Sequence, residues 1–274
     1  MKYPRVNFKN DFFNSENKKR SNPACRFKSL KLIDKIDRGA SPNFNEEKKL
    51  WKKGYKCVVG LDEAGRGPLA GPVVAAAVLF NNFQFPIFNF RSIFNEPILK
   101  QIKDSKQLTS IQREKIYNYF KKNPDIKWGV GIVSEKVIDK INILEATKLA
   151  MEKALASLRA RHSGRGNLNS RLLRRFTPRN DEWFLLIDGN FEINSIVRQK
   201  SVVKGDQKVF SCALASIFAK VTRDKIMEKE DKKYPNYGFA KHKGYGTAFH
   251  FKMIKKHGPC KIHRKSFYPV SNFT

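Results

Sequence analysis

The chain has 274 residues and a formal net charge of +30 at pH 7, because 55 Lys and Arg stand against 25 Asp and Glu. With 41% hydrophobic residues it can bury a core, which argues against a disordered chain, and its longest apolar stretch, Val73 to Phe80, is too short to cross a bilayer. The charge favours a polyanionic partner, and nucleic acid is the commonest one. Charge alone does not separate an enzyme acting on nucleic acid from a ribosome-associated protein.

The four cysteines form no recognisable pattern. None of them belongs to a C-x-x-C pair, so the sequence predicts neither a zinc site nor a disulfide framework, which fits a reducing compartment. The first ten residues hold no apolar segment of the kind that signal peptides need. We expect a cytoplasmic protein that makes no contact with a membrane and acts as a monomer.

The N-terminal part of the chain differs from the rest in composition. Residues 1–56 are polar and carry a net charge of +10. We expect residues 1–50 to form a flexible basic extension that becomes helical from about residue 45. Residues 51–274 are expected to form one folded domain, which ends in a basic and aromatic tail at 234–274.

Apolar patterns beyond residue 55 alternate between strands and helices. Strands are predicted at 57–62, 73–80, 128–133, 183–187 and 201–204, and helices at 109–121, 142–158, 209–229 and 247–256. Asn142 is the predicted cap of the second helix. Residues 81–95 and an Arg-rich insertion at 159–182 are expected to be exposed loops. This order predicts an α/β fold, a mixed β-sheet flanked by helices.

Four carboxylates lie at the edges of these predicted elements. Asp62 and Asp188 each end an apolar strand, so they share one crevice if the two strands are neighbours. Glu63 can join Asp62 only if the chain turns there, and Asp206 lies before a long helix, where it can also act as an N-cap. A turn or a cap is the better explanation for any one Asp alone. The set as a whole suits Mg²⁺ or Mn²⁺, two of which can bridge a phosphodiester.

The segment after the first strand reads Asp62-Glu63-Ala64-Gly65-Arg66-Gly67 and resembles the signature of the bacterial ribonuclease HII family. Further motifs of that family follow in order over about residues 45–270. They are Asp104-Ser105-Lys106-Gln107-Leu108, the helix from Asn142, Asp188-Gly189, Lys204-Gly205-Asp206, the helix motif from Ala215 to Asp224, His242-Lys243-Gly244-Tyr245-Gly246-Thr247, and His263 to Phe267.

The resemblance implies an RNase H-like fold and two-metal cleavage of the RNA strand in RNA·DNA hybrids. It also implies incision 5′ of single ribonucleotides embedded in duplex DNA, which leaves 3′-hydroxyl and 5′-phosphate ends. Asp62, Glu63, Asp188 and Asp206 would be the catalytic, metal-binding carboxylates. The backbone of Gly65, Arg66 and Gly67 would read the ribose 2′-OH, the group that separates RNA from DNA.

The same resemblance assigns two more substrate contacts in the domain and its tail. Tyr245 would stack on the sugar that follows the ribonucleotide, and Lys106 would contact a phosphate. The tail histidines, His242, His250, His257 and His263, lack zinc-finger spacing and are expected at the surface or near phosphate. Asp224 fits a helix-surface ion pair and an accessory acid near the site equally well.

Two other functions remain open at this point. A non-catalytic protein that binds RNA or hybrid duplexes would use the same basic surface, although it has no need of four acids amid phosphates. A ribonuclease HIII would differ at Gly65-Arg66-Gly67 and would carry an additional N-terminal binding domain, which residues 1–50 do not resemble.

Overall fold

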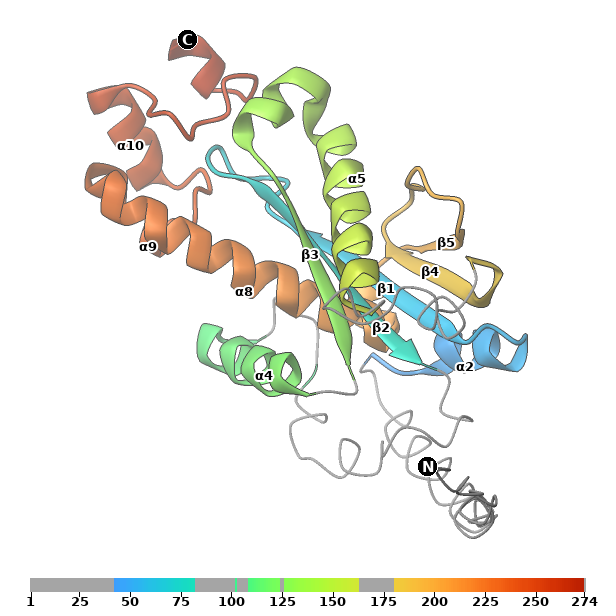
Figure 1. The fold of residues 1–274 in the computed structure, drawn as a ribbon. Coiled ribbons are helices and arrows are strands. Elements are labelled where there is room, and N and C mark those ends of the chain that lie inside the picture. Colours follow the sequence, from blue (N-terminus) through green and yellow to red (C-terminus); the bar gives the residue numbers. More distant parts are fainter. Residues whose placement is uncertain (1–41, 82–101, 103–107, 124–125, 163–179, 274) are drawn as a thin grey trace, which may run out of the picture.

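The computed structural model describes residues 42–81, 102, 108–123, 126–162 and 180–273. They form a five-stranded mixed sheet with the strand order β3-β2-β1-β4-β5 (Figure 1). The strands are β1 Cys57–Ala64, β2 Val73–Asn81, β3 Lys127–Val133, β4 Trp183–Asp188 and β5 Arg198–Val202. β2 is antiparallel to β1 and β3, whereas β4 is parallel to β1 and β5. The predicted fold class is confirmed.

Two long helices cover the two faces of the sheet. α5 Glu135–His162 packs on β1, β2 and β3, while α8 Phe210–Lys233 packs on β1, β2 and β4. Alternate residues of β1 therefore enter different cores. Val59 and Leu61 belong to the core beneath α5, and Val58 belongs to the core beneath α8. Both faces of the central strand β1 are buried from solvent, which explains its continuous apolar sequence.

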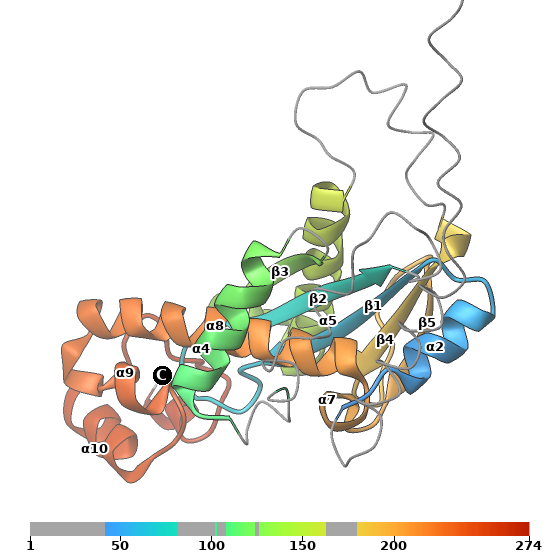
Figure 2. The same ribbon diagram turned by 90° about the horizontal axis from the view of Figure 1, so that it is seen from below.

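Shorter helices complete the molecule. They are α2 Asn45–Lys52, α4 Ser110–Lys122, η3 Asn180–Glu182, α7 Gly205–Lys208, η4 Pro235–Tyr237, α9 Phe239–His242, α10 Ala248–His257 and η5 Val270–Phe273. The C-terminal elements α9 and α10 lie beyond one end of the sheet (Figure 2). The segments that follow these two helices contact the turn between β1 and β2, because Leu69 N–H donates to Gly244 O and Gly71 N–H to Ile262 O. The described residues contain no helix that is long and apolar enough to cross a membrane.

The sequence correctly predicted that Asn142 caps a helix, but it did not predict the helical segment that precedes this residue. Its side chain accepts hydrogen bonds from the N–H groups of Leu144 and Glu145, as a cap does. A further helical segment, Glu135 to Ile141, precedes it, and the two join at a kink where Asn142 has φ 66°. Asn tolerates this left-handed φ better than most residues, so the same side chain supplies both the kink and the cap.

The folded domain begins earlier than the sequence indicated. Phe44, Leu50 and Trp51 are buried, and the Phe44 ring stacks on Phe210 with centroids 4.3 Å apart. The carboxylate of Glu47 accepts the Ser211 N–H at 2.9 Å and so caps the start of α8 from a distant part of the chain. Residues 42–50 therefore pack against the folded domain, whereas the sequence placed them in the basic extension. Residues 1–41, the loop 82–95 and residues 163–179 of the Arg-rich insertion lie outside the described residues.

Candidate active site

Three carboxylates converge at one edge of the sheet. β1 and β4 are parallel neighbours in which Leu61 pairs with Ile187, so Asp62 and Asp188 follow side by side. Asp206 reaches the same place from α7, which comes shortly after β5. Oxygen atoms of these three residues all lie within 4.8 Å of one another. The expectation that the strand ends share one crevice is confirmed.

Backbone N–H groups hold two of these carboxylates in place. Gly205 N–H donates to Asp188 Oδ1 at 2.6 Å, which ties α7 to the end of β4. Glu63 N–H donates to Asp62 Oδ1 at 2.6 Å. The predicted N-cap role of Asp206 was wrong. The N-cap of α8 is Val209, three residues later, and Asp206 lies inside α7, from where its side chain joins the cluster.

Glu63 borders the cluster from a different direction. β1 continues through Ala64 and Glu63 pairs with Ala75, so the turn expected at Glu63 does not exist. Its Oε1 lies 3.3 Å from an Arg66 guanidinium nitrogen, and its Oε2 is buried with no hydrogen-bond partner among the described residues. Glu63 is therefore not part of the cluster of Asp62, Asp188 and Asp206. Its Oε2 has no hydrogen-bond partner among the described residues and can contact a ligand.

The electrostatics of the cluster favour a bound cation. Burial, followed by the charges of Glu63 and Asp188, raises the pKa of Asp62 well above its usual range. Burial and the charge of Asp188 also raise the pKa of Glu63 to about 7, although Arg66 opposes this shift. Like charges held this close are destabilised unless a positive charge lies between them. Hard carboxylate oxygens in this arrangement fit a divalent cation such as Mg²⁺ or Mn²⁺.

The Gly65-Arg66-Gly67 loop and Tyr245 lie side by side next to this strand end. A Cβ added to Gly67 would be 3.8 Å from the Tyr245 ring, and the Tyr245 residue is 45% exposed. Gly65 has φ +100°, and a Cβ at that position would overlap the Arg223 side chain. The structure thus brings the predicted loop and the predicted aromatic together. Lys106 lies outside the described residues.

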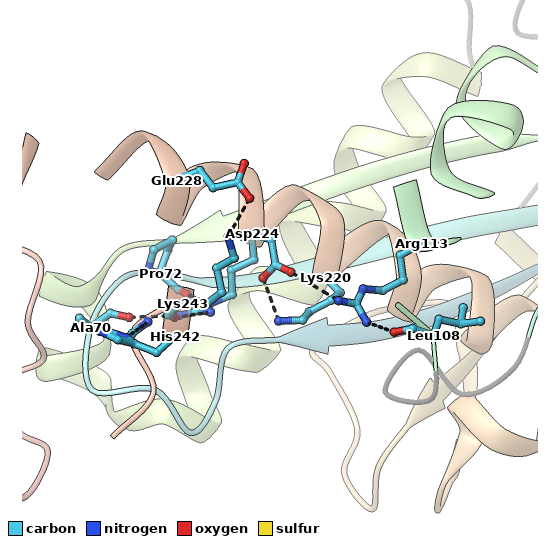
Figure 3. Close-up of polar contacts among 11 residues, drawn as sticks. Ala70, Pro72, Leu108, Arg113, Lys220, Asp224, Glu228, His242 and Lys243 are labelled. Atoms are coloured by element: carbon cyan, nitrogen blue, oxygen red, sulfur yellow. Dashed lines mark hydrogen bonds and ion pairs between the residues drawn. The ribbon is translucent and has the colours of Figure 1, made fainter. Parts of the chain in front are cut away.

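Cations that the sequence did not single out line a cavity of about 530 Å³ beside Tyr245. In Figure 3, Lys220 Nζ contacts Asp224 Oδ1 at 2.8 Å and Lys243 Nζ contacts Glu228 Oε1 at 2.7 Å. Asp224 also faces an Arg113 nitrogen at 3.9 Å, so it forms the ion pair that was one of its two predicted roles. These Lys residues were hidden in a sequence where basic residues are common.

The tail histidines do not all lie where the sequence placed them. His250 is 0% exposed and His263 is 2% exposed. The tail folds back over the β1–β2 turn, where Ala70 forms a bridge with His263, and this packing removes both rings from solvent. The expectation of surface positions was wrong for these two residues and holds for His257, which is exposed.

Comparison with solved structures agrees with the fold. The structure is similar to the ribonuclease H2 from Pyrococcus horikoshii, with a TM-score of 0.54 and 25% identity over 79% of this chain and 96% of that chain. It also shares its fold with Bst-RNase HIII in complex with Mn²⁺, at a TM-score of 0.58 and 16% identity over 81% and 70% of the two chains. The mixed sheet flanked by helices is thus the fold of ribonucleases H2 and HIII.

Sequence comparison identifies the family within that class. The family model for Ribonuclease HII matches residues 59–270. The chain is 47% identical to the Ribonuclease HII of Acetivibrio thermocellus over 222 residues, which are 81% of this chain and 73% of the relative. It is 44% identical to that of Chlamydia trachomatis serovar L2 over 230 residues, or 82% and 90%. The chain belongs to the ribonuclease HII family, and it is a ribonuclease H, a hydrolase of the RNA strand in RNA·DNA hybrids.

Proposed function

We propose that this ribonuclease H also incises duplex DNA on the 5′ side of single embedded ribonucleotides, leaving 3′-hydroxyl and 5′-phosphate ends. The observation that carries the proposal is the convergence of Asp62, Asp188 and Asp206 within 4.8 Å, next to a glycine-rich loop that lies beside Tyr245. The carboxylates would supply the chemistry, while the loop and the aromatic ring would select the nucleotide.

Asp62, Asp188 and Asp206 would hold two divalent cations, Mg²⁺ or Mn²⁺, with the buried and unpartnered oxygen of Glu63 as a further ligand. Such ions polarise a phosphodiester, lower the pKa of water and stabilise the leaving oxygen. The protein contributes fixed geometry. Gly205 N–H holds Asp188 and Glu63 N–H holds Asp62, so both carboxylates are oriented before a ligand arrives.

Selection of the ribonucleotide would depend on the Gly65-Arg66-Gly67 loop. Only glycine lets a backbone approach a sugar closely, and the 2′-OH is the chemical difference that a backbone can sense there. Tyr245 would stack on the next sugar, which lacks a 2′-OH at an RNA–DNA junction. Lys106 and the Lys residues of the cavity would contact phosphates, a sequence-independent attraction that salt weakens.

The test is cleavage of an end-labelled DNA duplex that contains one ribonucleotide, in Mg²⁺, in Mn²⁺ and in EDTA. An all-DNA duplex and a continuous RNA·DNA hybrid serve as controls. A single metal-dependent cut 5′ of the ribonucleotide is expected. Cleavage of the hybrid without this cut would leave the metal site intact and remove the junction-reading role of Tyr245. Tight binding of both duplexes with no cleavage would instead indicate a nucleic-acid-binding protein.

A further inference from the structure

A chain of hydrogen bonds runs through the buried tail histidines to Tyr245. His250 Nδ1 lies 2.9 Å from the Tyr245 carbonyl oxygen, and His250 Nε2 lies 3.0 Å from His263 Nε2. At the far end, Cys260 N–H donates to His263 Nδ1 at 2.9 Å. Neither ring is needed for a core of this size, since apolar residues would fill the space without burying four polar nitrogens.

The Tyr245 end fixes the direction of this chain. A carbonyl oxygen can only accept, so His250 Nδ1 carries the proton there and His250 Nε2 is an acceptor. His263 Nε2 therefore carries the proton toward His250 Nε2, and His263 Nδ1 accepts from Cys260 N–H at 2.9 Å, with Cys260 Sγ at 3.1 Å and Cys260 O at 3.3 Å from the same nitrogen. All four ring nitrogens are then satisfied with both rings neutral. Burial lowers the pKa of His250 and of His263 to about 4, so both rings are neutral at pH 7.

Arg264 follows His263 directly and reaches the other recognition loop. Its guanidinium is buried and donates to Gly65 O at 2.6 Å, to Arg66 O at 2.9 Å and to Gly71 O at 3.0 Å. Two adjacent tail residues are thus attached to different parts of the site. Arg264 holds the Gly65-Arg66-Gly67 loop, and His263 holds Tyr245 through His250.

We infer that His250, His263 and Arg264 are positioning residues that set the spacing between the Gly65-Arg66-Gly67 loop and Tyr245, and thereby the preference for an RNA–DNA junction over a continuous hybrid. The inference rests on the proposed function. An isolated ribonucleotide offers one 2′-OH and one following deoxyribose, so both contacts must be correct at once, within roughly 0.5 Å. A continuous hybrid offers a 2′-OH at every step and is less sensitive to a displaced Tyr245.

Two amide substitutions at His250 each remove one of its two hydrogen bonds, either the one to Tyr245 or the one to His263. In His250→Asn the amide nitrogen takes the place of Nδ1, so donation to Tyr245 O is kept and the contact with His263 is lost. In His250→Gln the amide takes the place of Nε2, so the contact with His263 is kept, while Tyr245 O loses the hydrogen bond from His250 and retains the one from Thr247 N–H at 2.9 Å. His257→Gln on the same helix is the matched control, because that ring is exposed.

The readout is the ratio of kcat/KM on the single-ribonucleotide duplex to kcat/KM on the continuous hybrid. Loss of one hydrogen bond predicts a fall of about ten-fold in this ratio for His250→Gln. His250→Asn, which keeps the contact with Tyr245 and loses the link to His263, should lower the ratio by a smaller factor, and His257→Gln should match the wild type. An unchanged ratio in His250→Gln, with or without an equal loss on both substrates, would overturn the inference, because a merely structural role moves both rates together.

A second measurement does not depend on junction cleavage. The ¹⁵N shifts of the imidazole nitrogens at pH 7 should show the proton on Nδ1 of His250 and on Nε2 of His263. A proton on His250 Nε2 would overturn the relay whatever the enzyme cuts. Failure of the wild type to incise the single-ribonucleotide duplex would defeat the proposed function, and the imidazole spectra would still decide the connection to Tyr245.

Discussion

The carboxylate cluster and the tail histidines are both buried and titratable, yet their environments are opposite. Asp62 and Glu63 lie among like charges, and burial and neighbouring carboxylates raise their pKa values, that of Glu63 to about 7. His250 and His263 satisfy each other's hydrogen bonds, and burial lowers their pKa values to about 4. The carboxylate cluster is electrostatically destabilised when no cation is bound. The ring nitrogens of the two histidines, in contrast, all have hydrogen-bond partners.

This difference follows from what each region has to do. A site that binds cations gains affinity from charges that the protein leaves uncompensated. A group that only positions a loop is most effective when it is neutral and all its polar atoms are hydrogen-bonded, because it then stays in one place. The supports differ accordingly. Asp62 and Asp188 are aligned by strand register and by hydrogen bonds from Glu63 N–H and Gly205 N–H, whereas Arg264 bridges to a loop almost 200 residues away in sequence.

The largest expected effect comes from removing one charge of the cluster. Asp62→Asn keeps the size of the side chain and removes a metal ligand, so kcat on the hybrid should fall on the order of a thousand-fold or more. Binding of the hybrid, measured in EDTA by fluorescence anisotropy, should be retained, because phosphate contacts supply most of the affinity. Asp181→Asn, on an exposed residue, is the control. Full activity in Asp62→Asn would contradict the assignment of the site.

Two N-terminal deletions test separately the residues that pack in the core and the basic extension that precedes them. Removing residues 1–50 deletes Phe44, Glu47 and Leu50 from the core, and the free energy of unfolding should fall by more than about 3 kcal/mol. Removing residues 1–41, which carry a net charge of +7, should leave stability unchanged and weaken duplex binding at low salt. Urea unfolding and binding titrations check both outcomes. Unchanged affinity after the shorter deletion would refute a role of the extension in binding.

The two loop glycines provide a smaller contrast. Gly65→Ala would push a methyl group into Arg223 at a left-handed φ, so the free energy of unfolding should fall by about 1–3 kcal/mol. Gly67→Ala meets only the Tyr245 ring at van der Waals distance and should change stability by less than about 0.5 kcal/mol. It should nevertheless slow incision at a single ribonucleotide, because the methyl group occupies the surface that a sugar would approach. Equal stability of the two variants would contradict the described loop geometry.

The sequence predicted the acidic site well because its parts depend on local rules. Apolar strands that end in Asp62 and Asp188 place both carboxylates at one edge once the strands pair in parallel, and this pairing is observed. The turn expected at Glu63 was wrong because pairing with β2 continues to Ala64, and Gly65 could not reveal where the partner strand ends. Strand length is set by the neighbour and not by the strand itself.

Features that depend on distant contacts were missed. Phe44 lies in a polar, basic segment, and only its stacking on Phe210 and its edge-to-face contact with Phe80 show that it belongs to the core. His250 and His263 are polar residues in a basic tail, so their composition indicated the surface. Their burial results from the return of the tail to the β1–β2 turn, a contact between residues far apart in sequence. No local periodicity encodes such a contact.

The pH dependence of stability should differ in sign between the two regions. In EDTA, Glu63, whose folded pKa is raised to about 7, stabilises the fold below its unfolded pKa near 4.5, and this contribution is lost as pH rises through about 7. A histidine whose folded pKa is lowered contributes fully above about 6.5 and loses this contribution as pH falls toward 4. His242, whose ring stacks on His250 at 4.4 Å, adds repulsion once it is protonated. Relative to the wild type, Glu63→Gln should therefore remove stabilisation that appears on acidification, while His250→Asn should remove a loss of up to about 3 kcal/mol between pH 6.5 and 4. Urea unfolding across this range checks both, and shifts of the same sign in the two variants would mean that the two regions are not the electrostatic opposites described above.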